Sequence, residues 1–286
     1  MELTEIKTSD GLLLQGISFS EKRKHAAIIY IHGLGGNFHS NPKKVYAFTK
    51  ECNKNGFGFF TFNNRGSHII TGFKVNGSYA ILGRCYEKFE DCIYDINAMI
   101  REAKKNGYKK IILVGHSTGA NKVVYYLSKK PDRSVCGGIL SGPVSDVPTQ
   151  IKGAGKKYKT LIQKATSMKR RNKGGELMPV GTPSWPISAS RFLSLSVPGS
   201  VEDVFQYHMK SGKAIYAAMK KINLPVLAIL GAKDEYVLTK PKKILKNYSE
   251  ANPIIETKLV QNATHSFTGK EKLLAKLVCS WAKKFS

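Results

Sequence analysis

The chain has 286 residues, 42% of them hydrophobic, and carries 46 Lys and Arg against 20 Asp and Glu, a formal net charge of +26. This apolar fraction can offset the entropy of ordering the chain, which excludes a disordered protein, and the length fits one large domain or a domain with an insertion. The charge alone indicates a nucleic acid, an anionic membrane or an acidic substrate as partner, or simply a lysine-rich surface.

The five cysteines are expected to be reduced, buried thiols, because their number is odd and none has CxxC spacing. The first residues contain no apolar run like that of a signal peptide, and no segment reaches the roughly 18 apolar residues of a membrane span. We therefore expect a soluble, cytoplasmic protein.

The elements in chain order predict a mostly parallel sheet with helices on both faces. Two alternating runs around Ser9-Asp10-Gly11 predict a hairpin at the start. After it, continuous apolar runs of strand length alternate with helical segments, which is typical of parallel strands buried between helices. The expected strands are 26–31, 56–62, 111–114, 136–140, 225–230 and 257–260, and the expected helices are 43–55, 84–106, 118–129 and 270–285.

Residues 146–223 interrupt this alternation, because they contain no buried parallel-strand run. Within them, the capping-box pattern Ser200-Val201-Glu202-Asp203 predicts a helix that begins at Ser200. We expect a core formed by 1–145 and 224–286, with 146–223 inserted as a cap over the carboxyl edge of the sheet. The apolar cap side chains expected to line a pocket or to pack the cap onto the core are Trp185, Ile187, Phe192, Leu193, Leu195, Val204, Phe205 and Met209.

A nucleophile motif follows the strand expected at 111–114. The sequence Gly115-His116-Ser117-Thr118-Gly119 has the form G-x-S-x-G and opens a helix. A serine on such a sharp elbow projects its Oγ beyond the sheet, and the flanking glycines let strand and helix pass each other. The N–H of Thr118 would then point at a developing oxyanion. An ordinary glycine-rich turn with an incidental serine is the alternative interpretation.

A second glycine-rich turn, His32-Gly33-Leu34-Gly35-Gly36, follows the strand expected at 26–31. It offers the backbone N–H of Leu34 as the second oxyanion donor. A phosphate-binding loop is the alternative, but the turn matches neither G-x-G-x-x-G nor the Walker pattern.

Asp234 and His265 complete a Ser-Asp-His set, in which each residue follows a different expected strand. A serine hydroxyl needs a base to take its proton, and the base needs a carboxylate to fix its tautomer. Asp146 and Glu235 are the alternative acids, because each also follows an expected strand.

The remaining polar residues are given structural roles. His32 and His116 flank the expected oxyanion donors and are interpreted as structural rather than as alternative bases. No His and acid pair has the spacing of metal ligands on one element, so neither a metal nor a cofactor is expected. The acidic side chains expected on the solvated or capping side of the helix 84–106 are Glu87, Glu90, Asp91 and Asp95.

The order of these motifs resembles that of the α/β-hydrolase superfamily. The succession HGLGG, NNRG, GHSTG, GAKDE and NATH, each after a strand, extends from the first hairpin to the last helix. The HGLGGN stretch, the FNNRG turn and the FEDCIYDI helix also resemble an esterase-like subgroup akin to the fungal siderophore esterases.

The resemblance implies an α/β-hydrolase fold with an inserted cap. It assigns Ser117 as the nucleophile, His265 as the base and then the acid, and Asp234 as the residue that orients His265. Leu34 and Thr118 are its oxyanion donors. The turn at Asn64 departs from the family pattern, because many relatives have an acid before the Arg-Gly.

These residues predict a serine hydrolase that cleaves carboxylic esters through an acyl-enzyme. Acyl transfer and the hydrolysis of thioesters or amides use the same machinery and stay open as alternatives. A non-catalytic basic binding protein on the same fold is a further alternative, which three triad residues on separate loops disfavour.

The charge is concentrated in the expected cap. Residues 146–222 hold 14 basic and 4 acidic side chains. Within them, the basic stretch 151–175 holds nine basic side chains and no acidic one. A positive field beside the entrance would attract an anionic ester and would weaken with salt. The expected partner is a small-molecule ester, anionic or neutral, rather than a nucleic acid, and the basic cap also allows transient contact with an anionic membrane.

Overall fold

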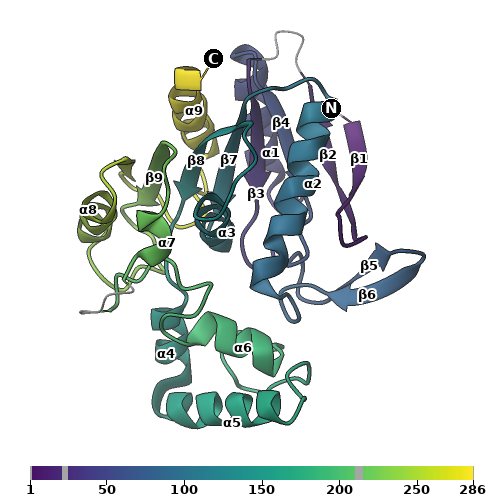
Figure 1. Ribbon diagram of the computed structural model, residues 1–286. Coiled ribbons are helices and arrows are strands. Elements are labelled where there is room, and N and C mark those ends of the chain that lie inside the picture. Colours follow the sequence, from purple (N-terminus) through teal and green to yellow (C-terminus); the bar gives the residue numbers. More distant parts are fainter. Residues whose placement is uncertain (1, 21–24, 210–214, 286) are drawn as a thin grey trace.

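The computed structural model describes residues 2–20, 25–209 and 215–285 (Figure 1). The strands of its main sheet are β1 (Glu2–Lys7), β2 (Leu13–Phe19), β3 (Ala27–Ile31), β4 (Gly58–Phe62), β7 (Ile111–His116), β8 (Val135–Ser141), β9 (Val226–Gly231) and β10 (Ile255–Val260). Their order is β1-β2-β4-β3-β7-β8-β9-β10. β2 pairs antiparallel with β1 and β4, and the other neighbours are parallel.

Helices cover both faces of the sheet, as Figure 1 shows. One face packs on α1 (Pro42–Lys54) and α9 (Glu271–Ala282), and the other on α2 (Cys92–Lys105), α3 (Thr118–Leu127) and α8 (Pro241–Ala251). β3 shows why such strands are apolar throughout. Ala27, Ile29 and Ile31 face one layer of helices, whereas Ile28 and Tyr30 face the other. The expected mostly parallel sheet with helices on both faces is confirmed.

Two of the helices expected from the sequence differ in the structure: one begins later than expected, and the other does not form among the described residues. The segment expected to be helical from residue 84 begins with a turn, and only a short 3-10 helix (Phe89–Asp91) precedes α2. The helix expected at Ser200 does not form among the described residues up to Met209. Ser200 Oγ still accepts the Asp203 N–H at 3.3 Å, but Glu202 points into the protein and accepts a hydrogen bond from Arg191.

Several elements have no counterpart among the sequence expectations. The helix α8 follows β9, and a hairpin of β5 (Thr71–Val75) and β6 (Ser78–Leu82) projects from the core in Figure 1. Its turn is Asn76-Gly77, with φ of 45° and 84°, the positive values that favour these two residues in tight hairpins. The Asn-Gly pair is thus a local sequence signal for this hairpin.

Part of the segment between β8 and β9 forms a separate helical layer, which contains α4 (Val147–Ala154), a 3-10 turn (Gly155–Lys157), α5 (Tyr158–Arg170) and α6 (Ala189–Ser196). The short helix α7 (Ala217–Lys220) packs instead on the core of the sheet, next to α3 and α8. Figure 1 places α4, α5 and α6 beyond the sheet, on the side where β8 ends. The helices α5 and α6 share a small core that includes Met168, Phe192 and Leu195. Residues 210–214 of the expected cap, and 1, 21–24 and 286 of the expected core, lie outside the described residues.

The cysteines are all free, and only Cys136 is not fully buried. Cys52 Sγ on α1 and Cys279 Sγ on α9 lie 3.8 Å apart where these two helices pack. None of the helices in the described ranges is long and apolar enough to cross a bilayer.

A buried carboxylate joins the helical layer to the core. Glu87 accepts hydrogen bonds from Lys122 on α3 and, at 3.2 Å, from Nη2 of Arg191 on α6. All three side chains are buried, and Arg191 also pairs with Glu202. Burial alone would raise the pKa of Glu87, but the charges of Lys122 and Arg191 outweigh it and lower this pKa. The expectation that Glu87 lies on a solvated helix face is wrong, because its partners come from distant parts of the chain.

Asp95 is likewise buried, against the same expectation. It accepts the backbone N–H of Arg65 at 2.9 Å, together with Nε at 3.0 Å and Nη2 at 2.8 Å. Arg65 also pairs with Asp10 at 3.1 Å and with Asp91 at 3.4 Å. The Arg-Gly turn after β4 is thus anchored to the first hairpin and to α2.

The substitution Glu87→Gln is expected to lower the free energy of unfolding by roughly 3 to 5 kcal/mol, because it leaves two buried cations without their shared carboxylate. Urea denaturation measures this change. Glu90→Gln, three residues away and only partly buried, is the control and should change stability by less than about 0.5 kcal/mol. Equal losses in the two variants would contradict the importance of the buried carboxylate.

Candidate functional site

Ser117 occupies a strained turn between β7 and α3. Its φ of 57° and ψ of −128° lie in a region that non-glycine residues rarely adopt. A Cβ on Gly115 would lie 2.2 Å from the Gly119 carbonyl oxygen, and a Cβ on Gly119 would lie 2.2 Å from that of Ile31. Only glycine fits at either position, so the spacing of the G-x-S-x-G motif follows directly from the packing of this elbow.

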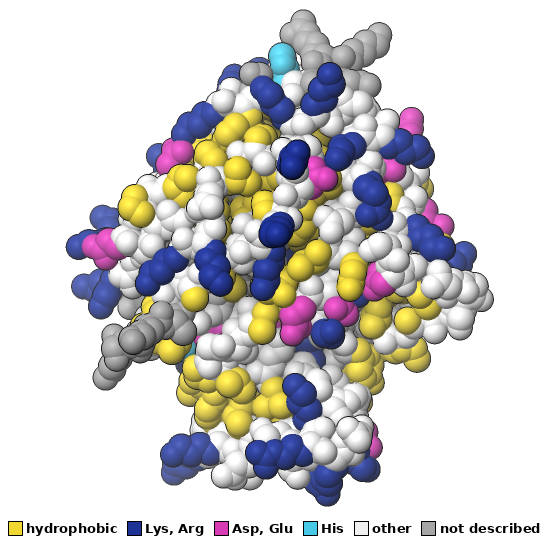
Figure 2. All heavy atoms as spheres, in the orientation of Figure 1, with side chains coloured by type: hydrophobic (Ala, Val, Ile, Leu, Met, Phe, Trp, Pro, Cys, Tyr) yellow, Lys and Arg dark blue, Asp and Glu magenta, His cyan; other side chains and the backbone are white. Residues whose placement is uncertain are grey.

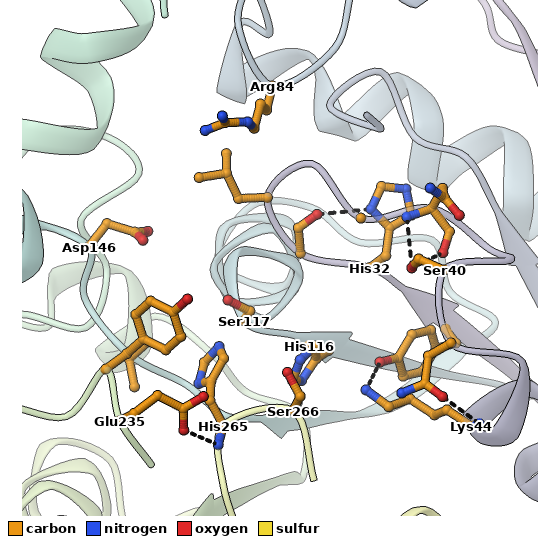
Figure 3. Close-up of a pocket in the computed structure, with 18 of the residues that line it drawn as sticks. His32, Ser40, Lys44, Arg84, His116, Ser117, Asp146, Glu235, His265 and Ser266 are labelled. Carbon is orange, nitrogen blue, oxygen red and sulfur yellow. Dashed lines mark hydrogen bonds between the residues drawn. The ribbon is translucent and has the colours of Figure 1, made fainter. Parts of the chain in front are cut away.

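Asp234 and His265 lie together beside Ser117. The Nδ1–H of His265 donates to Oδ2 of Asp234 at 2.8 Å, and both residues are buried. Asp234 follows β9 and His265 follows β10, so the parallel pairing of these strands brings the two loops to the same edge of the sheet. Figure 3 shows the imidazole of His265 directed toward the Ser117 side chain.

The alternative acids are placed differently. Glu235 accepts the backbone N–H of His265 at 2.9 Å and so supports the loop rather than the ring. Asp146 lies across the cavity in Figure 3, and its buried Oδ2 has no hydrogen-bond partner among the described residues. Burial, followed by the nearby charge of Glu202, raises the pKa of Asp146 to about 7. Asp234 is therefore the carboxylate that pairs with the imidazole.

The loop after β3 lies against the elbow. A Cβ on Gly33 would lie 2.7 Å from Cβ of Ser117, so only a glycine lets this backbone approach the serine so closely. The Gly36 N–H donates to the Gly33 carbonyl at 3.1 Å and fixes the turn. Within the described ranges the Leu34 N–H has no backbone acceptor. In the same ranges the N–H of Thr118, the first residue of α3, has no backbone acceptor either. Both groups are therefore available as donors.

His32 supports this loop from behind. Its Nδ1–H donates to the Gly33 carbonyl at 2.9 Å, and its Nε2 accepts the Asn64 N–H at 3.1 Å. Burial and the charge of Lys122 lower the pKa of His32 to about 3, so the ring is neutral. Lys122 Nζ donates to Asn64 Oδ1 at 3.0 Å, which connects the turn at His32 with the Glu87 ion pair.

His116 is partly buried, with its ring centroid 5.2 Å from that of His265. Burial, followed by the charges of Lys44 and His265, lowers the pKa of His116 well below its usual value. The ring of Tyr236 lies on His265 with a centroid distance of 4.6 Å. In the part of the chain that the structure describes, no group of three His, Cys, Asp or Glu side chains is placed to hold a metal ion.

A cavity of about 740 Å³ opens onto Ser117 and His265. The helical layer contributes part of its wall through Thr149, Gln150 and Gly153 of α4, and through Pro183. Of the two roles expected for the eight apolar cap side chains, the lining of a pocket is wrong, because none of them lines this cavity. Those that pack instead within the helical layer or against the core of the sheet are Ile187, Phe192, Leu193, Leu195, Val204 and Phe205.

The basic stretch faces solvent rather than the cavity. All nine of its Lys and Arg side chains are exposed, and none lines the cavity. Figure 2 shows Lys and Arg side chains on the outer surface over α5. The cations that do line the cavity are Lys44 and Arg84, which sequence reasoning missed. A signal for Lys44 exists, because it shares one helix face with the buried residues Phe48 and Cys52.

The order of the strands and the helices on both faces of the sheet are those of an α/β-hydrolase fold, as the sequence resemblance implied. The chain belongs to the family described as "Protein of unknown function (DUF1749)", whose model matches residues 4–284. No curated protein matches the sequence.

Solved structures share this fold at low sequence identity. The siderophore hydrolase EstB from Aspergillus fumigatus has a TM-score of 0.70 and 17% identity, with 100% of this chain and 98% of that chain covered. Est1E from Butyrivibrio proteoclasticus with ferulic acid bound has a TM-score of 0.67 and 18% identity, with 98% of each chain covered. The esterase Pf2001 from Pyrococcus furiosus has a TM-score of 0.60 and 16% identity, with 99% of this chain and 92% of that chain covered.

The substitution Gly33→Ala is expected to slow the labelling of Ser117 by a fluorophosphonate about 100-fold, because the new methyl group displaces the serine side chain. Labelling rates followed by mass spectrometry measure the effect. Gly175→Ala is the matched control, since a Cβ at that position meets no atom within 4 Å. Equal labelling of the two variants would show that the loop does not constrain the serine.

Asp146 is expected to make stability fall as pH rises from about 4 to about 7. In this window the carboxyl is ionised in the unfolded chain, with a pKa near 3.8, but is still protonated in the folded protein, with a pKa of about 7. The folded state therefore binds more protons, and raising the pH favours unfolding. Asp146→Asn removes this dependence. The stability of the variant relative to wild type, from urea denaturation, should grow across the window and level off above it, and a pH-independent difference would contradict the raised pKa.

Proposed function

We propose that the protein is a serine hydrolase that cleaves carboxylic esters through an acyl-enzyme. The observation that carries this proposal is the hydrogen-bonded pair of His265 and Asp234 beside Ser117, which is held on a strained elbow. Strain of this kind costs about 1 to 3 kcal/mol and persists where the surrounding structure imposes it, commonly at active sites.

In the first half of the reaction, Ser117 Oγ attacks the ester carbonyl carbon while Nε2 of His265 takes the hydroxyl proton. Asp234 holds the imidazole in the required tautomer and stabilises its positive charge. The backbone N–H groups of Leu34 and Thr118 donate to the oxygen that gains negative charge. The tetrahedral intermediate then collapses, and the alcohol leaves with the proton from His265.

In the second half, His265 takes a proton from a water molecule, which attacks the acyl-enzyme carbonyl. The same N–H groups stabilise the second oxyanion, and the carboxylic acid leaves as Ser117 recovers its proton. An alcohol in place of water gives acyl transfer, and thioesters or amides could enter the same sequence of steps. Two of the solved structures of similar fold support ester cleavage, since Pf2001 is an esterase and EstB is a siderophore hydrolase.

Residues 146–223 act in this proposal as a cap that shapes one side of the site. Its helix α4 contributes to the cavity wall, and Leu34 packs against the core of the helical layer. The buried pair of Arg191 and Glu87 fastens this layer to the core. The cap therefore holds a fixed wall beside the nucleophile, and the proposed oxyanion loop rests on it.

Ser117→Ala is expected to lower kcat for 4-nitrophenyl esters by about 10⁴-fold or more and to abolish fluorophosphonate labelling, because the attacking oxygen is lost. Asp234→Asn should lower kcat by about 10⁴-fold through the wrong imidazole tautomer. Rates are measured across a series of acyl lengths. Ser266→Ala is the matched control, because this serine also lines the cavity.

Full activity of Ser117→Ala would overturn the mechanism. A correctly folded wild type that neither hydrolyses any ester nor takes the fluorophosphonate label would indicate instead a non-catalytic binding protein.

A further inference from the structure

Lys44 is a buried cation in the wall of the cavity. Its side chain on α1 is 6% exposed, and Nζ donates to the hydroxyl of Tyr30 at 3.4 Å. Within residues 2–20, 25–209 and 215–285, no carboxylate lies within 4.0 Å of Nζ. The other buried lysine of the described ranges, Lys122, differs sharply, because Glu87 and Asn64 bind its ammonium group directly.

This buried ammonium is destabilising, because the hydroxyl of Tyr30 and the ring of Tyr30, whose centroid lies 5.9 Å from Nζ, replace only part of the hydration that it loses. Burial accordingly lowers the pKa of Lys44 to about 8, although the more distant charge of Glu271 opposes this shift. Most molecules therefore still carry the charge at neutral pH. Such an unmatched charge in a cleft is typical of a group whose partner arrives with a ligand.

The surroundings of Lys44 suit a short chain that ends in a negative group. Figure 3 places Lys44 and Asp146 on opposite sides of Ser117, so the cavity extends past the nucleophile in two directions. On the Lys44 side, the wall combines the rings of Phe48 and Phe59 with the polar side chains of Ser40 and Asn41. Both rings are buried, so the apolar surface that can pack against methylene groups is the partly exposed side chain of Val45, while Lys44 and the Tyr30 hydroxyl are placed to bind an anion.

The direction of the reaction assigns this branch to the acid part of the ester. His265 gives its proton to the departing alcohol, so the alcohol part must lie on the His265 side of Ser117. Figure 3 shows Lys44 away from His265, beyond His116. The Lys44 branch is therefore on the side of Ser117 that is open to the acyl chain of a bound ester.

We propose that Lys44 binds a terminal carboxylate on the acyl chain, so that the preferred substrates are half-esters of dicarboxylic acids. This inference rests on the proposed ester hydrolysis and adds the class of acid to it. A single ammonium group with a hydroxyl beside it matches one carboxylate, whereas a doubly charged phosphate would require more donors than this branch offers. Arg84, the other cation of the cavity, donates Nη1 to the Ser184 carbonyl at 3.1 Å.

The test compares pairs of 4-nitrophenyl esters that differ only at the end of the acyl chain. The half-esters of adipic, pimelic and suberic acid are measured against esters of the methyl-terminated acids of equal length, after subtraction of the uncatalysed rate. Chains this long avoid the internal anhydride formation that makes shorter half-esters unstable. The readout is the ratio of kcat/KM for the carboxylate ester to that for its methyl counterpart.

Wild type is expected to prefer the carboxylate at one or more chain lengths, and Lys44→Met should reduce that ratio about 10- to 100-fold, as expected for a lost hydrogen bond to a charged group. Lys43→Met is the matched control, because Lys43 is the neighbouring but exposed residue of α1, and its ratio should equal that of wild type. Lys44→Met should also raise the melting temperature, since it removes an unpaired buried charge. A purely structural lysine would give a lower melting temperature and an unchanged ratio.

A binding measurement keeps the proposal separate from the catalytic mechanism. Monomethyl adipate is titrated calorimetrically into Ser117→Ala, with and without Lys44→Met, and methyl hexanoate serves as the neutral probe. Tighter binding of the carboxylate that depends on Lys44 supports the proposal even if turnover fails.

Two results would overturn the role of Lys44 and leave the proposed ester hydrolysis standing. One is a wild type that hydrolyses neutral esters without preferring any half-ester. The other is an equal ratio of kcat/KM values in Lys44→Met and Lys43→Met. Should Lys44→Met fail to fold, Tyr30→Phe tests the same anion site through the loss of its hydroxyl.

Discussion

The geometry of the site depends on the ion pairs that the buried carboxylate of Glu87 forms with Lys122 and Arg191. In the interior, where charges are weakly screened, the carboxylate has to remain in contact with both Lys122 and Arg191. Lys122 belongs to α3, the helix that follows the nucleophile, and Arg191 belongs to α6 of the helical layer. A Cβ on Gly66 would lie 2.3 Å from this carboxylate, so the turn after β4 is part of the same contact. One acidic group thus sets the positions of three segments around the cavity.

The parts of the fold that could be predicted are those in which the signal is local and repeated. Buried strands such as β3 and β7 are apolar on both faces, and a parallel sheet brings their carboxyl ends to one edge. That edge is also why Ser117, Asp234 and His265 could be grouped from sequence alone, although they lie far apart along the chain. The elbow adds a steric requirement for glycine on each side of the serine, which the sequence displays directly.

The errors occur where a side chain has a distant partner. Helical periodicity assigns Glu87 and Asp95 to a solvated face, but Lys122 and Arg65 provide the charges that allow them to be buried. Glu202 likewise forms no capping box, because Arg191 binds its carboxylate inside the protein. Lys44 is missed for a related reason, since a lysine on a helix is ordinarily expected in solvent, but its burial comes without a carboxylate partner in the described ranges. In each case the pattern gives the local preference, and only the assembled fold reveals what surrounds the side chain.

The separation between the core of the helical layer and the wall of the cavity has an evolutionary consequence. Met168, Phe192 and Leu195 fill the interior of that layer, whereas α1 and α4 each contribute residues to the wall of the cavity. Mutations in these two sets of residues can therefore accumulate under different selective pressures. The first set is constrained by folding and the second by the ligand, so related lineages could diverge in substrate by changing a few positions on α1 and α4 while inheriting the rest of the layer unchanged.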